Sequence, residues 1–390
     1  MQDTNFNIKW AFTVLFIALF VSMLGLGVVS PLLSIYADDL GATGIWLGAI
    51  FSGFNIARAI IMPVVGRLSD RWGRRKAFLI VGMVFFGLSS IGYVLASTAL
   101  HLFFGRFLQG LGAGMVLPIS TAYIGDITPH GKEGLYTSII SIARTLGWGC
   151  GPLLSGFISE GYGIQLPFYI MGGLALISCL LLVTALPEYR HIHTHSSTSS
   201  YREILRNKTV RSLVLYRAIN AIGTGNLFSF FPLLADSLGA SPTEIGLLLS
   251  SRILTMSLLQ GLFGILVDRY DKIKLILISG AASAVFMLLI PFAYTFIELL
   301  VVGILIGVTW AVIMPAVTAL GAEHGRDSGM ASVLSTINMG FSVGMIIGPI
   351  TSGFIQDTFD LQSVFYFGGL TAFGGVLIFY FLTRNHQSLS

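Results

Sequence analysis

The chain has 390 residues, of which 54% are hydrophobic and only 10% are charged, with a formal net charge of +4. Soluble domains carry roughly 25% charged residues, so this composition excludes a soluble globule, and the small basic excess gives no reason to expect a nucleic-acid partner. The apolar segments have the length of helices that cross a hydrocarbon core, and the alternating pattern of membrane strands is absent. We therefore expect an all-α membrane protein.

Twelve apolar segments follow one another along the chain, and each can span a bilayer as a helix. They cover residues 11–36, 45–66, 77–97, 100–124, 135–159, 164–186, 211–236, 243–267, 275–295, 298–321, 329–356 and 362–383. The first segment is longer than the apolar core of a cleavable signal peptide, so we interpret it as a retained helix. Because twelve is an even number, both termini are expected on the same side.

The basic residues of the loops indicate which side this is. Every Lys and Arg outside the spans lies near a terminus or in the loops at 67–76, 125–134, 187–210, 268–274 and 322–328. The alternate loops carry none. The positive-inside rule then predicts a multi-pass protein of the cell (plasma or inner) membrane with cytoplasmic N- and C-termini.

The second half of the chain repeats the first at an offset of 197 or 198 positions. Leu-Gly-Ala-Thr at 40–43 matches Leu-Gly-Ala-Ser at 238–241, and Pro118 matches Pro315. The longest polar stretch, 187–210, lies at the midpoint. We expect two pseudo-symmetric six-helix halves, 1–186 and 211–390, joined by a cytoplasmic linker at 187–210, as in alternating-access transporters.

The loop at 66–76 reads Gly-Arg-Leu-Ser-Asp-Arg-Trp-Gly-Arg-Arg-Lys, and we name it the basic loop. Asp70 can accept hydrogen bonds from the free N–H groups at a neighbouring helix start, and the basic side chains can pair with Asp126. A plain topogenic loop is the alternative, although it would not require Gly66, Asp70 and Gly73 at fixed places. The expected conformational latch comprises Gly66, Asp70, Arg71, Gly73, Arg74, Arg75 and Asp126, with Asp268 and Arg269 in the second copy.

The basic loop resembles the signature G-x-x-x-D-R-x-G-R-R-[KR] of the major facilitator superfamily. The copy at 264–274 keeps Asp268 and Arg269 but has Asp271 in place of the second glycine. The resemblance covers essentially the whole chain and implies the major facilitator fold, a transporter and a small-molecule substrate. We expect no enzyme activity, no cofactor and no metal, and a monomer that works with protons in the lipid bilayer.

The fourth span contains Arg106, Gln109 and Gly110 on one helical face. This run is similar to the fourth-helix motif R-x-x-Q-G-x-G of the same family, in which the arginine is proposed to act in proton transfer or its electrostatics. An arginine held by backbone carbonyls for packing is the alternative. We expect proton coupling to involve Arg106 together with Asp38 and Asp39, although exposed carboxylates at the outer face would look the same.

Small residues recur at every fourth position in the fifth and eleventh spans, which lets helix backbones approach closely. We expect these spans to pack against the opposite half and to hinge at their prolines, with ordinary tight packing as the alternative. The fifth-span pattern resembles the motif of the superfamily's antiporters, best known from drug/proton exporters, and so implies export. The residues concerned are Gly147, Gly151, Pro152 and Gly156, repeated as Gly344, Gly348 and Pro349.

All acidic residues lie in loops or near span ends, whereas five arginines lie well inside spans. Positive potential in a cavity favours anionic, zwitterionic or neutral solutes. The family resemblance implies a cavity lined by spans one, four, seven and ten, and each polar residue there could equally form a helix–helix hydrogen bond. The substrate-binding candidates are Asn55, Arg58, Arg144, Asn220, Thr224, Phe228, Arg252, Trp310 and Met314.

The sequence therefore predicts a secondary active transporter that exports small organic solutes, drug-like or amphipathic, by proton-coupled antiport with alternating access. The alternative is a uniporter or proton symporter for a small anionic metabolite. A nucleotide-binding loop and the motifs of intramembrane hydrolases are absent from the sequence, which disfavours ATP-driven transport and catalysis.

Overall fold

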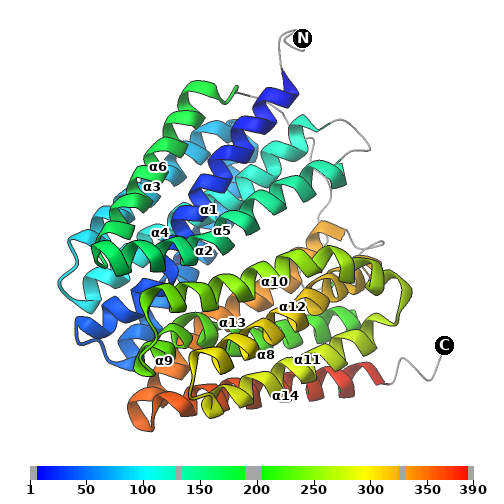
Figure 1. Ribbon diagram of the computed structural model, residues 1–390. Coiled ribbons are helices and arrows are strands. Elements are labelled where there is room, and N and C mark those ends of the chain that lie inside the picture. Colours follow the sequence, from blue (N-terminus) through cyan, green and yellow to red (C-terminus); the bar gives the residue numbers. More distant parts are fainter. Residues whose placement is uncertain (1–6, 129–132, 189–203, 325–329, 385–390) are drawn as a thin grey trace. The chain divides into compact units, whose positions relative to one another are not determined.

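The computed structural model describes residues 7–128, 133–188, 204–324 and 330–384, and within these ranges the chain is helical, without a strand (Figure 1). The first helices are α1 (Ile8–Asp39), α2 (Gly44–Trp72), α3 (Arg75–Val94), α4 (Ala99–Ile127), α5 (Glu133–Tyr162) and α6 (Leu166–Ala185). They are followed by α8 (Lys208–Ser229), α9 (Phe231–Ser237), α10 (Pro242–Arg269), α11 (Lys272–Leu289), the 3₁₀ helix η1 (Ile290–Phe292), α12 (Phe296–His324), α13 (Met330–Thr358) and α14 (Leu361–Thr383).

Eleven helical segments within the described residues are long and apolar enough to cross a membrane, with α8 and α9 counted as one. Helix α5, with 30 residues, has comparable length. Large apolar side chains such as Leu258, Ile278 and Leu370 are exposed near the middle of their helices. Because exposed apolar side chains in such numbers suit a lipid environment rather than water, the predicted all-helical membrane protein is confirmed.

The helices form two compact units. The first consists of residues 1–41, 53–195 and 241–250, and the second of residues 42–52, 196–240 and 251–390. Helices α2 and α10 thus contribute their first residues to one unit and the remainder to the other. The predicted division at 1–186, 187–210 and 211–390 stays a prediction, because residues 189–203 of the linker lie outside the described ranges.

The internal repeat is visible in the packing within each unit. In the first unit α1 packs against α5 and α6, and α3 packs against α4 and α6. In the second unit α8 packs against α13 and α14, and α11 packs against α12 and α14. The same pattern of neighbours therefore occurs twice, as expected for two copies of one bundle.

Glycines end three of the long helices because the chain must enter the left-handed region there. Gly41, Gly73 and Gly239 have φ values of 72°, 61° and 81°, which cost little only without a Cβ atom. Gly41 and Gly239 occupy equivalent places in the two copies, and each donates its N–H to the carbonyl three residues earlier. The repeated Leu-Gly-Ala sequence is therefore a repeated helix end.

Two prolines interrupt helices that the apolar pattern predicts to be continuous. The span predicted at 211–236 breaks at Phe230 between α8 and α9, because Pro232 has no N–H to donate to the carbonyl of Phe228. The span predicted at 275–295 changes from α-helix to 3₁₀ helix at Ile290, next to Pro291. Hydropathy predicted the spans and could not predict these local breaks.

Candidate functional site

The basic loop forms a tight turn between α2 and α3 in the first unit. Gly73 closes this turn with a positive φ, and its N–H donates to the carbonyl of Ser69 at 2.9 Å. Two residues later Arg75 begins α3, and its side chain is buried. The glycine of the motif thus serves to fold the chain back and bring Arg75 inside.

Arg75 connects three side chains with one guanidinium group. Its Nη1 lies 2.6 Å from a carboxylate oxygen of Asp70 and 2.9 Å from the hydroxyl of Ser69, and its Nε lies 3.0 Å from a carboxylate oxygen of Asp126. Lys76 adds hydrogen bonds from Nζ to two carbonyls at the end of α6. The loop is therefore tied to α2, α4 and α6, and the pairing of a basic loop residue with Asp126 is present as expected.

The second copy solves the same turn with different chemistry. Asp271 stands where the second glycine of the motif would be, and its carboxylate accepts hydrogen bonds from the N–H groups of Ile273 and Lys274. It is therefore the N-cap of α11, a position that Asp favours. Lys272 then pairs with Glu323 at 2.8 Å, so an ion pair between the third and fourth helices of the bundle occurs in both units.

Arg106 lies in a buried polar cluster within the first unit. Its Nη1 donates to Oε1 of Gln109 at 2.9 Å, and the hydroxyl of Tyr93 donates to the same oxygen at 2.8 Å. The guanidinium also lies over the ring of Phe54, 5.7 Å from its centroid. One amide oxygen thus joins α3 and α4 and holds the arginine in place, which is the arrangement required of a residue with a fixed electrostatic role.

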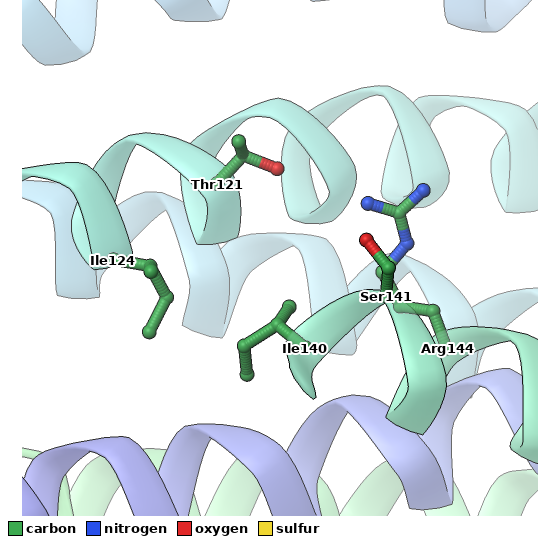
Figure 2. A pocket seen from close by; sticks show the side chains of 5 residues that line it. All are labelled: Thr121, Ile124, Ile140, Ser141 and Arg144. Atoms are coloured by element: carbon green, nitrogen blue, oxygen red, sulfur yellow. The ribbon is translucent and has the colours of Figure 1, made fainter. Parts of the chain in front are cut away.

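Arg144 borders a small pocket between α4 and α5. Figure 2 shows Thr121 and Ile124 on α4 facing Ile140, Ser141 and Arg144 on α5, with the Ser141 hydroxyl beside the arginine. The guanidinium of Arg58 lies within electrostatic range of Arg144. The first unit therefore holds two neighbouring cations together with hydroxyl groups, a combination that suits hydrogen-bond acceptors.

Arg217 and Arg252 are the corresponding intramembrane cations of the second unit, and both are buried. Arg217 lies over the ring of Phe341 at 4.4 Å and contacts the sulfur of Met314 at 3.2 Å. Arg252 lies over the ring of Phe228 at 4.5 Å. Neither forms an ion pair within the described part of the chain, so both guanidinium groups are held by aromatic faces.

The remaining polar substrate candidates are buried in their helices. Asn55 lies on α2, and Asn220 and Thr224 lie one turn apart on α8. The Thr224 hydroxyl donates to the backbone carbonyl of Asn220 at 3.0 Å. This local bond satisfies the threonine, so its burial by itself does not indicate a ligand.

The described acidic residues all lie near helix ends. Asp38 and Asp39 are exposed in the last turn of α1, and Asp126 is engaged with Arg75. Glu160 accepts a hydrogen bond from the N–H of Thr243 at the start of α10 in the first unit. At the equivalent place in the second unit, Asp357 accepts from Gly44 and Ile45 at the start of α2, so both carboxylates cap helix N-termini.

The glycine stripes correct one expectation. Gly147 and Gly151 of α5 lie against the backbone of α1, and Gly344 and Gly348 of α13 lie against the backbone of α8. These glycines therefore pack against the first helix of their own unit, and the prediction that they face the opposite half is wrong for them. A stripe of small residues predicts close approach of helices but carries no information about which helix approaches.

The outer members of the stripes and the prolines have a separate role. Gly156 lies against the backbone of Pro242 and Thr243, within the first unit, and Gly353 lies against Gly44 and Ile45, within the second. Pro152 and Pro349 lie inside α5 and α13. The hinge role of these prolines stays a prediction.

Sequence reasoning missed the aromatic partners of the buried cations. Tyr93, Phe54 and Phe341 were not candidates, although Tyr93 orients Gln109 and the two phenylalanines lie under Arg106 and Arg217. In a chain with 29 phenylalanines and 13 tyrosines, only helical spacing from an intramembrane arginine could have found them, and Phe341 comes from a different helix.

Comparison with known proteins places these features in a family. The sequence matches the Major Facilitator Superfamily over residues 15–217 and 213–390. It is 30% identical to an uncharacterized MFS-type transporter of Methanocaldococcus jannaschii, covering 92% of this chain and 94% of the relative, and 27% identical to Multidrug resistance protein 1 of Bacillus subtilis, covering 94% of each. The solved structure of the nucleoside transporter NupG matches with a TM-score of 0.82 and 17% identity, covering 95% of this chain and 99% of that one.

Proposed function

Because the chain belongs to the Major Facilitator Superfamily, a family of transporters rather than enzymes, we propose that it exports small organic solutes by proton-coupled antiport. The proposed substrates are drug-like or amphipathic, and the proposed mechanism is alternating access. The protein acts as a monomer in the cell membrane, with both termini in the cytoplasm.

The observation that carries export is the full-length similarity to Multidrug resistance protein 1 of Bacillus subtilis together with the glycines of α5. Gly147 and Gly151 allow α5 to lie directly against the backbone of α1, and Pro152 follows at once without an N–H to donate. This combination of close contact and a missing backbone hydrogen bond lets a helix bend without losing its packing, and it supports an antiporter reading of the motif.

The proposed latch is the basic loop with its partners. Asp70 is 56% exposed on its side chain although Arg75 holds it, so it retains the capacity to accept hydrogen bonds from elsewhere in another conformation. Arg106, fixed by Gln109, is the proposed electrostatic element of proton coupling. Asp38 and Asp39, which are exposed at the end of α1, are the proposed groups that exchange protons with the outer solution.

The second candidate function is uptake of a small anionic metabolite by uniport or proton symport. It is favoured by the charges inside the helices, which are arginines, with the described acids confined to helix ends. This observation concerns the charge of the solute and leaves the direction of transport open.

A pH-gradient experiment distinguishes the candidates. The purified full-length protein is reconstituted into proteoliposomes with fluorescent organic dyes of each charge class, and a pH gradient is imposed in either direction. Antiport predicts that dye moves against the proton flow and that reversing the gradient reverses dye movement. Symport predicts movement with the protons, and uniport predicts no response. Protein-free liposomes measure leakage, and the same rate under both gradients would exclude proton-coupled export.

A further inference from the structure

The second unit contains two buried guanidinium groups without an acidic partner. Arg217 and Arg252 are each 6% exposed, and within the described residues neither pairs with a carboxylate. Removing a guanidinium from water is expensive unless a counter-charge or a full set of hydrogen-bond acceptors replaces the water. An aromatic face replaces only part of that stabilisation.

Arg252 is the arginine with an open donor at membrane depth. It lies ten residues into α10, roughly 15 Å along the helix from its start, which is the middle of a hydrocarbon core of about 30 Å. Its Nη2 is buried and has no hydrogen-bond partner among the described residues. Its planar group lies over the ring of Phe228 from α8, which leaves the edge that carries the N–H groups available.

A second open donor lies on the helix that contacts Arg252. Gly307 of α12 lies against the backbone carbonyl of Arg252, 2.6 Å from where its Cβ would be. Trp310 follows one turn later on the same helical face, and its indole Nε1 is also buried without a hydrogen-bond partner in the described chain. The neighbourhood thus offers N–H donors and aromatic surfaces, and it contains no carboxylate.

We propose that Arg252 binds the anionic group of the transported solute, with Trp310 as a second donor and the ring of Phe228 as the surface that orients the guanidinium. This inference rests on the proposed transport function and names its substrate class as aromatic or apolar molecules that carry a carboxylate or sulfonate. A guanidinium presents parallel N–H groups to two oxygens of such an anion. The solute supplies the counter-charge that the protein lacks.

Arg217 differs in ways that make it the matched control. Its Nη1 contacts the Met314 sulfur, and its ring partner is Phe341 of α13. Only its Nε lacks a partner in the described residues, and a single Nε cannot form the parallel pair of bonds to an anion. Replacing Arg217 therefore removes an equal charge from the same unit while leaving the donors near Trp310 intact.

The test measures binding to the purified full-length protein in detergent, without a pH gradient. The probes share one ring system: naphthalene-2-sulfonate, 2-naphthoate and the cation 2-naphthylmethylammonium. Wild type is expected to bind both anions at least about tenfold more tightly than the cation. Arg252→Gln is expected to weaken anion binding about 10- to 100-fold, the range for lost hydrogen bonds to charged groups. Arg252→Lys should recover part of it, because the charge remains but the fork is lost, and Arg217→Gln should change it less than about threefold.

Two results would overturn the proposal. One is wild-type protein that binds the ammonium probe as tightly as the anions. The other is a folded Arg252→Gln variant, judged by gel filtration and thermal midpoint, with unchanged preference for anions, which would leave Arg252 a packing role. If Arg252→Gln does not fold, the affinity of Arg252→Lys relative to Arg217→Lys decides. Since binding is measured without flux, intact anion binding with no gradient-driven transport would reject antiport and leave this inference standing.

Discussion

The side chains of Arg75 and Asp126 form an ion pair at 3.0 Å in which each is only 4% exposed. The equivalent pair 197 positions later, Lys272 and Glu323, has a similar distance of 2.8 Å, but its side chains are 19% and 46% exposed. The internal repeat has therefore kept the pairing and changed its burial. Because screening by water determines what an ion pair contributes, the two pairs should respond differently to the same kind of substitution.

We predict that Asp126→Asn destabilises the protein by about 3 kcal/mol, at the lower end for a broken buried pair because Arg75 keeps Asp70 and Ser69. Glu323→Gln should cost at most about 1 kcal/mol, as expected for an exposed pair. Unfolding of the purified full-length variants in detergent, followed by tryptophan fluorescence, compares them. Equal destabilisation by the two substitutions would show that burial does not separate the pairs.

The proposed latch makes a different prediction for Asp70. Its carboxylate is half exposed, so Asp70→Asn should cost at most about 1 kcal/mol of stability. The same change should shift the balance between inward- and outward-open states and lower transport, because a neutral amide interacts weakly with a helix N-terminus. Distances between spin labels on the two halves report the balance. Asp268→Asn in the second copy, where the carboxylate is exposed, is the matched control and should change it less.

Gly151 and Gly161 lie on the same helix and differ only in their surroundings. A Cβ atom on Gly151 would lie 2.6 Å from the backbone of Gly27 on α1, whereas a Cβ atom on Gly161 has no neighbour within 4 Å. Gly151→Ala should therefore force α1 and α5 apart and cost about 1–3 kcal/mol, as overpacking does. Gly161→Ala should be neutral or slightly stabilising. Thermal midpoints and flux of both variants measure the difference, and a wild-type-like Gly151→Ala protein would contradict the close packing.

The features that the sequence predicted well share a physical origin. The helical spans, the repeat and the partner of the basic loop follow from the cost of placing charge or unpaired backbone in hydrocarbon, and that cost is written into composition and spacing. Gly73 is an example, because a fixed glycine between two spans already implies a left-handed turn. The pairing of Arg75 with Asp126 follows from opposite charges at the same end of the bundle.

The features that escaped prediction depend on contacts between distant segments. The stripe through Gly147 and Gly151 indicated close packing but not α1 as the partner. The ring of Phe341 under Arg217 comes from a helix more than 100 positions away. The break at Phe230 needed knowledge of which side of Pro232 bends. Pattern reasoning therefore found the cations of the candidate site and missed the aromatic side chains that hold them.

The cluster around Gln109 gives the last prediction, which concerns coupling. The Gln109 oxygen accepts from both Arg106 and Tyr93, so the two donors can be removed separately. Tyr93→Phe deletes one neutral hydrogen bond of about 1 kcal/mol and leaves Arg106 in place, so gradient-driven flux should fall only about fivefold. Arg106→Ala deletes the buried charge itself and should abolish gradient-driven flux while downhill exchange continues. Arg106→Lys keeps the charge and should recover part of the coupling if its electrostatics matter more than its geometry. Both fluxes are measured in the same proteoliposomes, with and without a pH gradient, and normal gradient-driven transport by Arg106→Ala would show that coupling does not pass through this arginine.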